Sequence, residues 1–229
     1  MGDNDFPNFE DGQEETQGKS TEIDTEMPLD VRLISTTTSF AKSVNNKAIR
    51  PSRARPNYFL SVRLDSEEIR EKFAEFSTHV NTKYPAYKRL LTEPRQFHVT
   101  LFVFHLKDAN RIIHTKDCLL ACQDILKETC PDGAPSLHFR GIDTFNENRV
   151  VYTFPEETTG LDLFTKLTYC LQEKFKSEGI VNTREEFKPH ATLLKIRRPF
   201  TIRSQNSKNQ VVKRIPSEVF EDFKGEARF

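Results

Sequence analysis

The same four-residue pattern, His-x-Thr followed by an apolar residue, occurs in two strand-like segments of this chain. The copies are His98-Val99-Thr100-Leu101 and His190-Ala191-Thr192-Leu193. On a β-strand, side chains two positions apart point to the same face, so each histidine projects together with its threonine. A fold that brings the two strands side by side therefore gathers two imidazoles and two hydroxyls in one cleft.

The pattern is selective within this sequence. Four further histidines lack a threonine two positions on: His79, His105, His114 and His138. A single His-x-Thr in a strand is more often a packing or surface residue than a functional one. Burying an unpaired histidine or threonine in an apolar strand costs free energy, so two identical placements favour a function.

Cleavage of a phosphodiester without a metal needs this set of groups. One neutral imidazole removes a proton from the attacking hydroxyl or water, and the other, as imidazolium, protonates the leaving oxygen. Threonine hydroxyls donate hydrogen bonds to the non-bridging phosphate oxygens, whose charge shifts in the transition state. We therefore predict that the catalytic residues are His98, Thr100, His190 and Thr192, with no cofactor and no metal.

The order of expected elements indicates an α+β or α/β fold. Strands are expected over 58–64, 97–106, 136–143, 149–154 and 190–196. A helix capped by Asp65 is expected to bury a stripe from Ile69 to Val80, and others over 109–128 and from Leu161 to Phe175, where Gly179 ends the helix. A polar stretch over 197–210 precedes a short last helix over 216–223.

The formal net charge of zero is a sum over unlike segments. Residues 1–30 carry ten acids and one base, whereas residues 31–55 carry six bases and no acid. With few large apolar side chains, residues 1–55 are expected to be a disordered tail, and residues 56–229 the folded domain. Overall neutrality argues against a generic nucleic-acid coat. The basic cluster at Arg50, Arg53 and Arg55 fits either a nuclear-import signal or a solvated linker.

The four cysteines show no C-x-x-C spacing and no histidine at a zinc-finger distance. We expect free thiols in a reducing compartment, with a zinc site as the alternative. No apolar run approaches the ~20 residues that cross a bilayer, and the start does not resemble a signal peptide. The sequence thus favours a monomer in the cytoplasm or nucleus, with no membrane partner.

Residues 187–217 contain eight bases and no acid, which fits a clamp on an oligonucleotide backbone or a solvated loop. Lys195 belongs to this stretch, but strict alternation points it away from His190 and Thr192. Several phenylalanines near the motifs are candidate platforms for base stacking, although core packing is the favoured interpretation of each: Phe97, Phe102, Phe104, Phe145 and Phe187. By alternation, Phe102 and Phe104 share the face of His98 and Thr100.

These residues resemble the two-histidine (2H) phosphoesterases, and within them the central domain of the gamma/delta-type A-kinase anchoring proteins. The resemblance covers roughly 56–224 and rests on Pro56-Asn57-Tyr58-Phe59-Leu60, Phe97 to Leu101, Gly141-Ile142-x-Thr144-Phe145 and Phe187-Lys188-Pro189-His190-x-Thr192-Leu193-x-Lys195. It implies a bilobal α+β fold in which two antiparallel sheets face a central cleft, with helices outside. It also implies cleavage of 2′,5′-linked oligoadenylates, the signal that related viral enzymes remove in innate immunity.

Several alternatives stay open at this point. The cleft could hold AMP or CMP without turnover, or act in RNA processing on 2′,3′-cyclic phosphates or 3′ ends. The attacking group is either the ribose 3′-hydroxyl, which yields a cyclic phosphate, or water. Either His98 or His190 is the base. Because the family's amphipathic kinase-binding helix has no counterpart here, binding to a kinase regulatory subunit is not expected.

Overall fold

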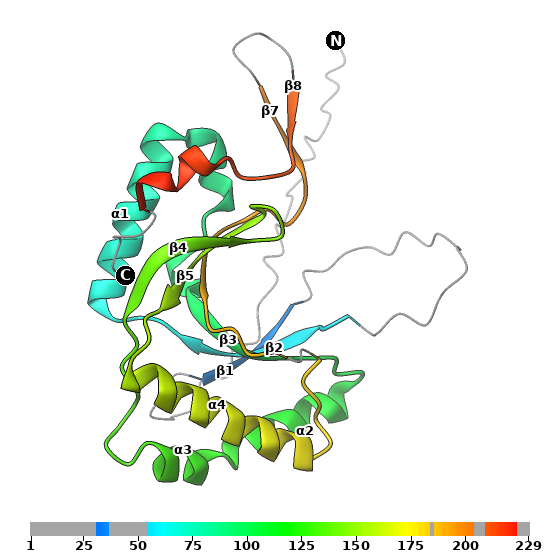
Figure 1. Cartoon of the computed structure of the whole chain (residues 1–229). Coiled ribbons are helices and arrows are strands. Elements are labelled where there is room, and N and C mark those ends of the chain that lie inside the picture. Colours follow the sequence, from blue (N-terminus) through cyan, green and yellow to red (C-terminus); the bar gives the residue numbers. More distant parts are fainter. Residues whose placement is uncertain (1–30, 37–54, 184–185, 204–208, 224–229) are drawn as a thin grey trace, which may run out of the picture.

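A six-stranded sheet organises the molecule. The computed structural model describes residues 31–36, 55–183, 186–203 and 209–223 (Figure 1). The strand order is β1-β2-β3-β6-β5-β4, and every neighbouring pair is antiparallel. The strands are β1 (Val31–Ser35), β2 (Tyr58–Arg63), β3 (His98–Phe104), β4 (Phe139–Phe145), β5 (Val150–Pro155) and β6 (Ala191–Lys195). With its helices, this sheet confirms the α+β class.

The sheet consists of two three-stranded halves. Strands β2 and β3 pair along their length, whereas β3 and β6 meet at the single pair Val99↔Ala191. Figure 1 shows the half with β4 and β5 strongly inclined to the half with β1 and β2. The two antiparallel sheets expected from the sequence are therefore these halves, joined edge to edge at the strands that carry the two motifs.

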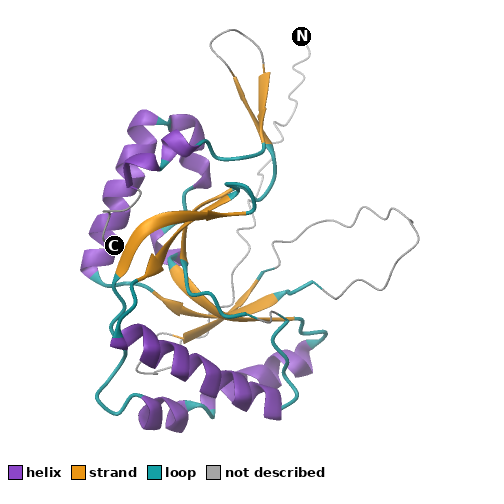
Figure 2. Cartoon of the chain, in the orientation of Figure 1, coloured by secondary structure: helices purple, strands orange, loops and turns teal. Residues whose placement is uncertain are grey.

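Helices cover the outer faces of both halves. They are α1 (Glu67–Lys83), α2 (Ala109–Leu120), α3 (Gln123–Thr129) and α4 (Thr159–Ser177). Figure 2 shows α2, α3 and α4 gathered beside the half with β1 to β3, and α1 beside β4 and β5. Ring contacts tie these layers together: Phe175 of α4 lies 5.8 Å from Phe102 of β3, centroid to centroid.

The first helix keeps its predicted buried stripe but has a different cap. Its N-cap is Ser66, whose side chain accepts a hydrogen bond from the Ile69 amide. Asp65, expected as the cap, instead lies within 4.0 Å of the guanidinium groups of Arg63 and Arg70. Serine and aspartate cap equally well, so the sequence could not choose between neighbours.

The single helix expected over 109–128 is two helices. Helix α2 ends at Leu120 and α3 begins at Gln123. Between them Cys122 leaves helical geometry, with φ −84° and ψ 1°, and its thiol donates to the Cys118 carbonyl. Cys122 and Leu126, four positions apart, are both buried.

Near the C-terminus one prediction, the helix stop at Gly179, is confirmed, and two others are revised. Gly179, at φ 70°, follows α4 as predicted and supplies the left-handed conformation that ends it. The polar stretch 197–210 contains most of a hairpin, β7 (Phe200–Arg203) with β8 (Asn209–Val212). The short last helix is two 3-10 turns, Ser217–Val219 and Glu221–Phe223.

Residues 31–35 form an edge strand, although the sequence placed them in a disordered tail. Val31 and Leu33 are 1% and 2% exposed and belong to the core. Five residues with three apolar side chains bury too little surface alone, and they become a strand because β2 offers an edge. Residues 1–30 and 37–54 of the predicted tail, with Arg50 and Arg53, lie outside the described residues.

All four cysteines are free, as expected, and Cys118 and Cys122 are buried. Within the described ranges, none of the helices has the length and apolar character needed to cross a membrane.

Candidate active site

The two His-x-Thr motifs lie on adjacent central strands. The pair Val99↔Ala191 fixes the register of β3 against β6. In an antiparallel pair this register sets His98 opposite Thr192 and Thr100 opposite His190, all four on one face. Residues directly opposite have Cβ atoms about 4.5–5.5 Å apart. The structure thus brings together the four predicted residues, each of them half-buried.

The register extends across the sheet as two rows of side chains on this face. The His98 row runs Arg63, His98, Thr192, Tyr152, Asp143. The His190 row runs Arg32, Ser61, Thr100, His190, Phe154, Arg140. Each histidine therefore faces the threonine of the other motif across the junction of the two halves, and polar residues continue outward on both sides.

Both imidazoles are oriented in the same way. The Nδ1 atom of His98 lies 2.5 Å from the Gln96 carbonyl oxygen, and Nδ1 of His190 lies 2.7 Å from the Lys188 carbonyl oxygen. A carbonyl only accepts hydrogen bonds, so each Nδ1 carries a proton and donates. The titrating nitrogen is then Nε2 in both rings, the arrangement that a general base or acid requires.

Aromatic rings hold each imidazole from the side. The Phe59 ring stacks on His98, 5.0 Å between centroids and 27° between planes. Phe145 and Tyr152 meet His190 edge-on at 4.9 and 5.2 Å and stack on each other at 4.0 Å. Of the phenylalanines singled out from the sequence, Phe145 is the one in ring contact with a motif histidine.

The electrostatics of the site favour a neutral His98. Burial lowers the pKa of His98, the Gln96 carbonyl raises it, and the positive charge of Lys195 lowers it further, with a net downward shift. Beside His190, the pKa of Tyr152 is raised by burial and by the hydrogen bond that its hydroxyl donates to Asp143, so this phenol stays protonated.

A β-bulge in β3 turns Phe102 and Phe104 away from the face of His98 and Thr100, where strict alternation placed them, and confirms that both are core residues. Leu60 pairs with Phe102 but Ser61 pairs with Thr100, so Leu101 is an extra residue. The extra residue reverses the alternation. Phe102 and Phe104, each 1% exposed, consequently point to the core and contact Phe175 of α4.

A second bulge, in β6, overturns the exclusion of Lys195. Tyr152 pairs with Thr192 but Val151 pairs with Leu194, so Leu193 is the extra residue. Leu193 and Leu194 are both fully buried, and Lys195 returns to the face of Thr192. The effect of its charge on His98 agrees with this placement.

The basic stretch divides between the site and the surface. Lys188 Nζ lies 5.0 Å from the centroid of Phe145, beside His190. Arg214 instead forms an ion pair with Glu147 at the β4–β5 turn. Arg197 and Arg198 are exposed, Lys208 lies outside the described residues, and nothing is described of the Arg203 side chain.

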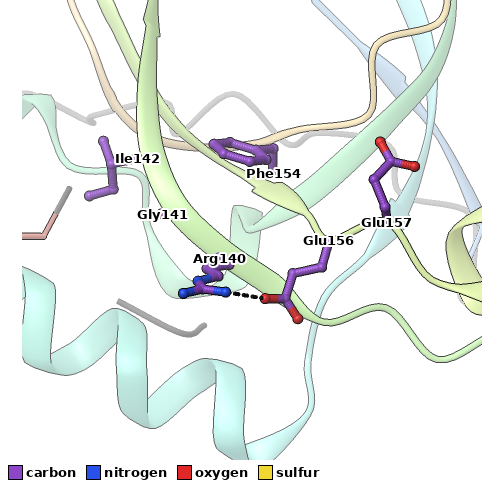
Figure 3. A pocket seen from close by; sticks show the side chains of 6 residues that line it. All are labelled: Arg140, Gly141, Ile142, Phe154, Glu156 and Glu157. Carbon is purple, nitrogen blue, oxygen red and sulfur yellow. Dashed lines mark hydrogen bonds and ion pairs between the residues drawn. The ribbon is translucent and has the colours of Figure 1, made fainter. Parts of the chain in front are cut away.

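Two hollows flank the outer end of the His190 row. One, about 630 Å³, is lined by Arg140, Phe154, Glu156 and Glu157, and Figure 3 shows Arg140 directed at Glu156, 3.3 Å away. The other, about 510 Å³, includes Tyr152 and Lys188 in its lining. Phe154 lines both and is 40% exposed. No local sequence signal marks Phe154, because its position beside His190 depends on the register of β5 against β6. Across the described ranges, no group of three or more His, Cys, Asp or Glu is placed to hold a metal ion.

Paired His–Thr motifs on the adjoining strands of two antiparallel half-sheets are the arrangement expected of a two-histidine phosphoesterase. The chain belongs to the AKAP7 2′5′ RNA ligase-like domain family, whose model matches residues 56–227. The predicted resemblance is thereby confirmed, and membership of this family points to phosphodiesterase chemistry.

Individual proteins that resemble this chain share a quarter or less of its aligned residues. Human A-kinase anchor protein 7 isoform gamma is 25% identical over 169 residues, which are 73% of this chain and 47% of the relative, so the match spans about half of that protein. TT0787 of Thermus thermophilus has a TM-score of 0.42 at 19% identity, covering 67% of this chain and 79% of its own. Escherichia coli LigT, solved with 3′-AMP, has a TM-score of 0.40 at 21% identity, covering 60% and 71%.

Proposed function

We propose that this chain is a phosphodiesterase that cleaves short RNA, with 2′,5′-linked oligoadenylates as the preferred substrate class, through His98 and His190. The observation that carries the proposal is the register of β3 against β6, which faces each histidine with the other motif's threonine. The family match to a 2′5′ RNA ligase-like domain supports the linkage.

The scissile phosphate sits between the two strands in this proposal. Nε2 of one histidine takes the proton of a ribose 3′-hydroxyl, whose oxygen forms the new bond to phosphorus. The bond from phosphorus to the 5′-oxygen breaks, and Nε2 of the other histidine gives that oxygen a proton. The products are a 2′,3′-cyclic phosphate and a free 5′-hydroxyl; attack by water gives a linear monophosphate instead. The Thr100 and Thr192 hydroxyls donate to the non-bridging oxygens.

We assign His98 as the base and His190 as the acid. A base has to be neutral before it reacts, and burial together with the charge of Lys195 favours the neutral form of His98. The lysine also counters the negative charge of a phosphate bound beside it. His190 takes the acid role because one base and one acid are needed.

The nucleobase is expected beside Phe154. In that hollow Glu156 is paired with Arg140, and Glu157 adds a second carboxylate, so a phosphate is disfavoured there. An exposed aromatic face suits a neutral base, and stacking of this kind contributes about 1–3 kcal/mol per base.

The first experiment measures turnover of a 2′,5′-linked adenylate dimer, its 3′,5′-linked isomer and a 2′,3′-cyclic phosphate, with products separated by chromatography. His98→Ala and His190→Ala should each lower turnover by about 10²-fold or more. Full activity of both variants would refute the mechanism, and loss of activity with EDTA would point to a metal. Binding of AMP without cleavage favours the binding module, and hydrolysis of the cyclic phosphate alone favours RNA processing.

A substrate with a good leaving group separates the two roles. When p-nitrophenolate replaces the 5′-nucleoside, the leaving oxygen needs no proton. This substrate should restore activity to His190→Ala and leave His98→Ala inactive. The reverse pattern would exchange the two assignments.

A further inference from the structure

Arg32, which is 8% exposed, occupies the end of the His190 row. It pairs with Ser61, which in turn pairs with Thr100, so these three side chains share the face of the two histidines. Val31 and Leu33, on either side of it in sequence, point to the core, which confirms that Arg32 points the other way. Residue 32 also precedes the segment that matches the family model.

Ser61 gives a second and independent indication. This residue is 1% exposed, and its hydroxyl oxygen has no hydrogen-bond partner in the structure. Leaving such a group unsatisfied costs about 1–3 kcal/mol, so a buried hydroxyl normally has a partner. Ser61 lies between Arg32 and Thr100 in the register of the row, and all three residues carry groups that can donate hydrogen bonds to an anionic oxygen.

The spacing excludes the scissile phosphate as that anion. Strands lie about 4.7–4.9 Å apart, so β1 is about 10 Å from β3 and farther from the junction of β3 and β6. An extended arginine covers much of this distance but not all of it. The candidate anion is therefore a phosphate one unit along the substrate chain. A guanidinium stays charged at every working pH and binds phosphate with two parallel hydrogen bonds.

We propose that Arg32 and Ser61 form a subsite for a second phosphate, so that the enzyme prefers substrates with a phosphate next to the scissile one. This inference rests on the proposed function. The strand that carries Arg32 then adds substrate specificity to the family domain as well as an edge to its sheet.

The experiment compares an adenylate dimer, which has one phosphate, with its 5′-phosphorylated form and with the trimer, on the full chain at fixed salt. Wild type should have a higher kcat/KM for the 5′-phosphorylated dimer and the trimer, which carry a second phosphate, than for the plain dimer. Charge-assisted hydrogen bonds are worth about tenfold or more, so Arg32→Gln should lower the trimer-to-dimer ratio of kcat/KM by about tenfold. Ser61→Ala should lower the same ratio by a smaller factor.

Arg70→Gln is the matched control, because Arg70 is an exposed arginine on α1 and belongs to neither row. It should keep the wild-type ratio. If Arg32→Gln fails to fold, as judged by thermal unfolding, Arg32→Lys and Ser61→Ala carry the test. An unchanged ratio in these variants, or an equal loss on dimer and trimer, overturns the subsite.

Binding separates failure of the subsite from failure of the proposed function. Dissociation constants of fluorescently labelled trimer and dimer are measured with the same variants. A wild type that binds the trimer more tightly than the dimer but cleaves neither refutes only the catalytic function. A wild type that shows no preference in either assay refutes the subsite.

Discussion

The bulge in β3 assigns Phe102 to the core, and replacing it tests that assignment. The side chain is 1% exposed and contacts Phe104 and Phe175 at ring-centroid distances of 6.0 and 5.8 Å. Phe102→Ala therefore removes a buried ring between β3 and α4. Such changes cost about 3–5 kcal/mol, which lowers the unfolding temperature of a domain of this size by roughly 6–20 °C.

Phe154→Ala is the reciprocal variant, because this ring is 40% exposed and lies in the His190 row. Its cost in stability should stay below about 1 kcal/mol, and its effect should fall on KM, by about tenfold if a base stacks there. Calorimetry gives the unfolding temperatures, and kinetics at a temperature where both variants are folded give KM and kcat. Phe102→Ala should stay close to wild type in KM.

The opposite result would refute the reasoning. If Phe102→Ala kept the wild-type unfolding temperature and raised KM, the ring would line the cleft, as simple alternation suggests. Phe102→Leu, which leaves a smaller cavity, keeps the test informative if the alanine variant does not fold.

Three further predictions concern β1, the base and the buried thiols. Leu33→Ala should lower the free energy of unfolding by about 2–5 kcal/mol in urea titrations, since Leu33 is 2% exposed; an unchanged midpoint would contradict a stable β1. Lys195→Met removes a charge that lowers the pKa of His98, so the acidic limb of the pH profile of kcat/KM should move to higher pH, and an unmoved limb would contradict this placement of Lys195. Burial raises the pKa of Cys122 to about 12, so at pH 8 a thiol reagent should modify it only on unfolding, and rapid modification of the native protein would disprove that burial.

Much of the fold could be predicted because its signals are local. The apolar stripe of α1 and the stop at Gly179 depend on residues close in sequence. Where two local signals compete, the predicted boundary was wrong by one residue, as at the N-cap of α1, which is Ser66 and not Asp65. It failed outright for β1, because an edge strand of five residues depends on a partner far along the chain.

The candidate site shows the same division. Period-two alternation within each motif placed every histidine with its own threonine, and the repeated pattern identified the family. Alternation could not place Phe102 or Lys195, because one extra residue in each strand reverses the faces beyond it. A bulge is a property of a strand pair and has no signature in one strand alone.

The sequence by itself determined which groups would do the chemistry, because residue type and spacing along one strand are encoded locally. Only the tertiary structure decided which groups meet. The register of β3 against β6 faces His98 with Thr192 and Thr100 with His190, and the pairing of β1 with β2 brings Arg32 into the same row. Those pairings join residues dozens of positions apart, and their stability comes from burying both halves of the sheet against their helices.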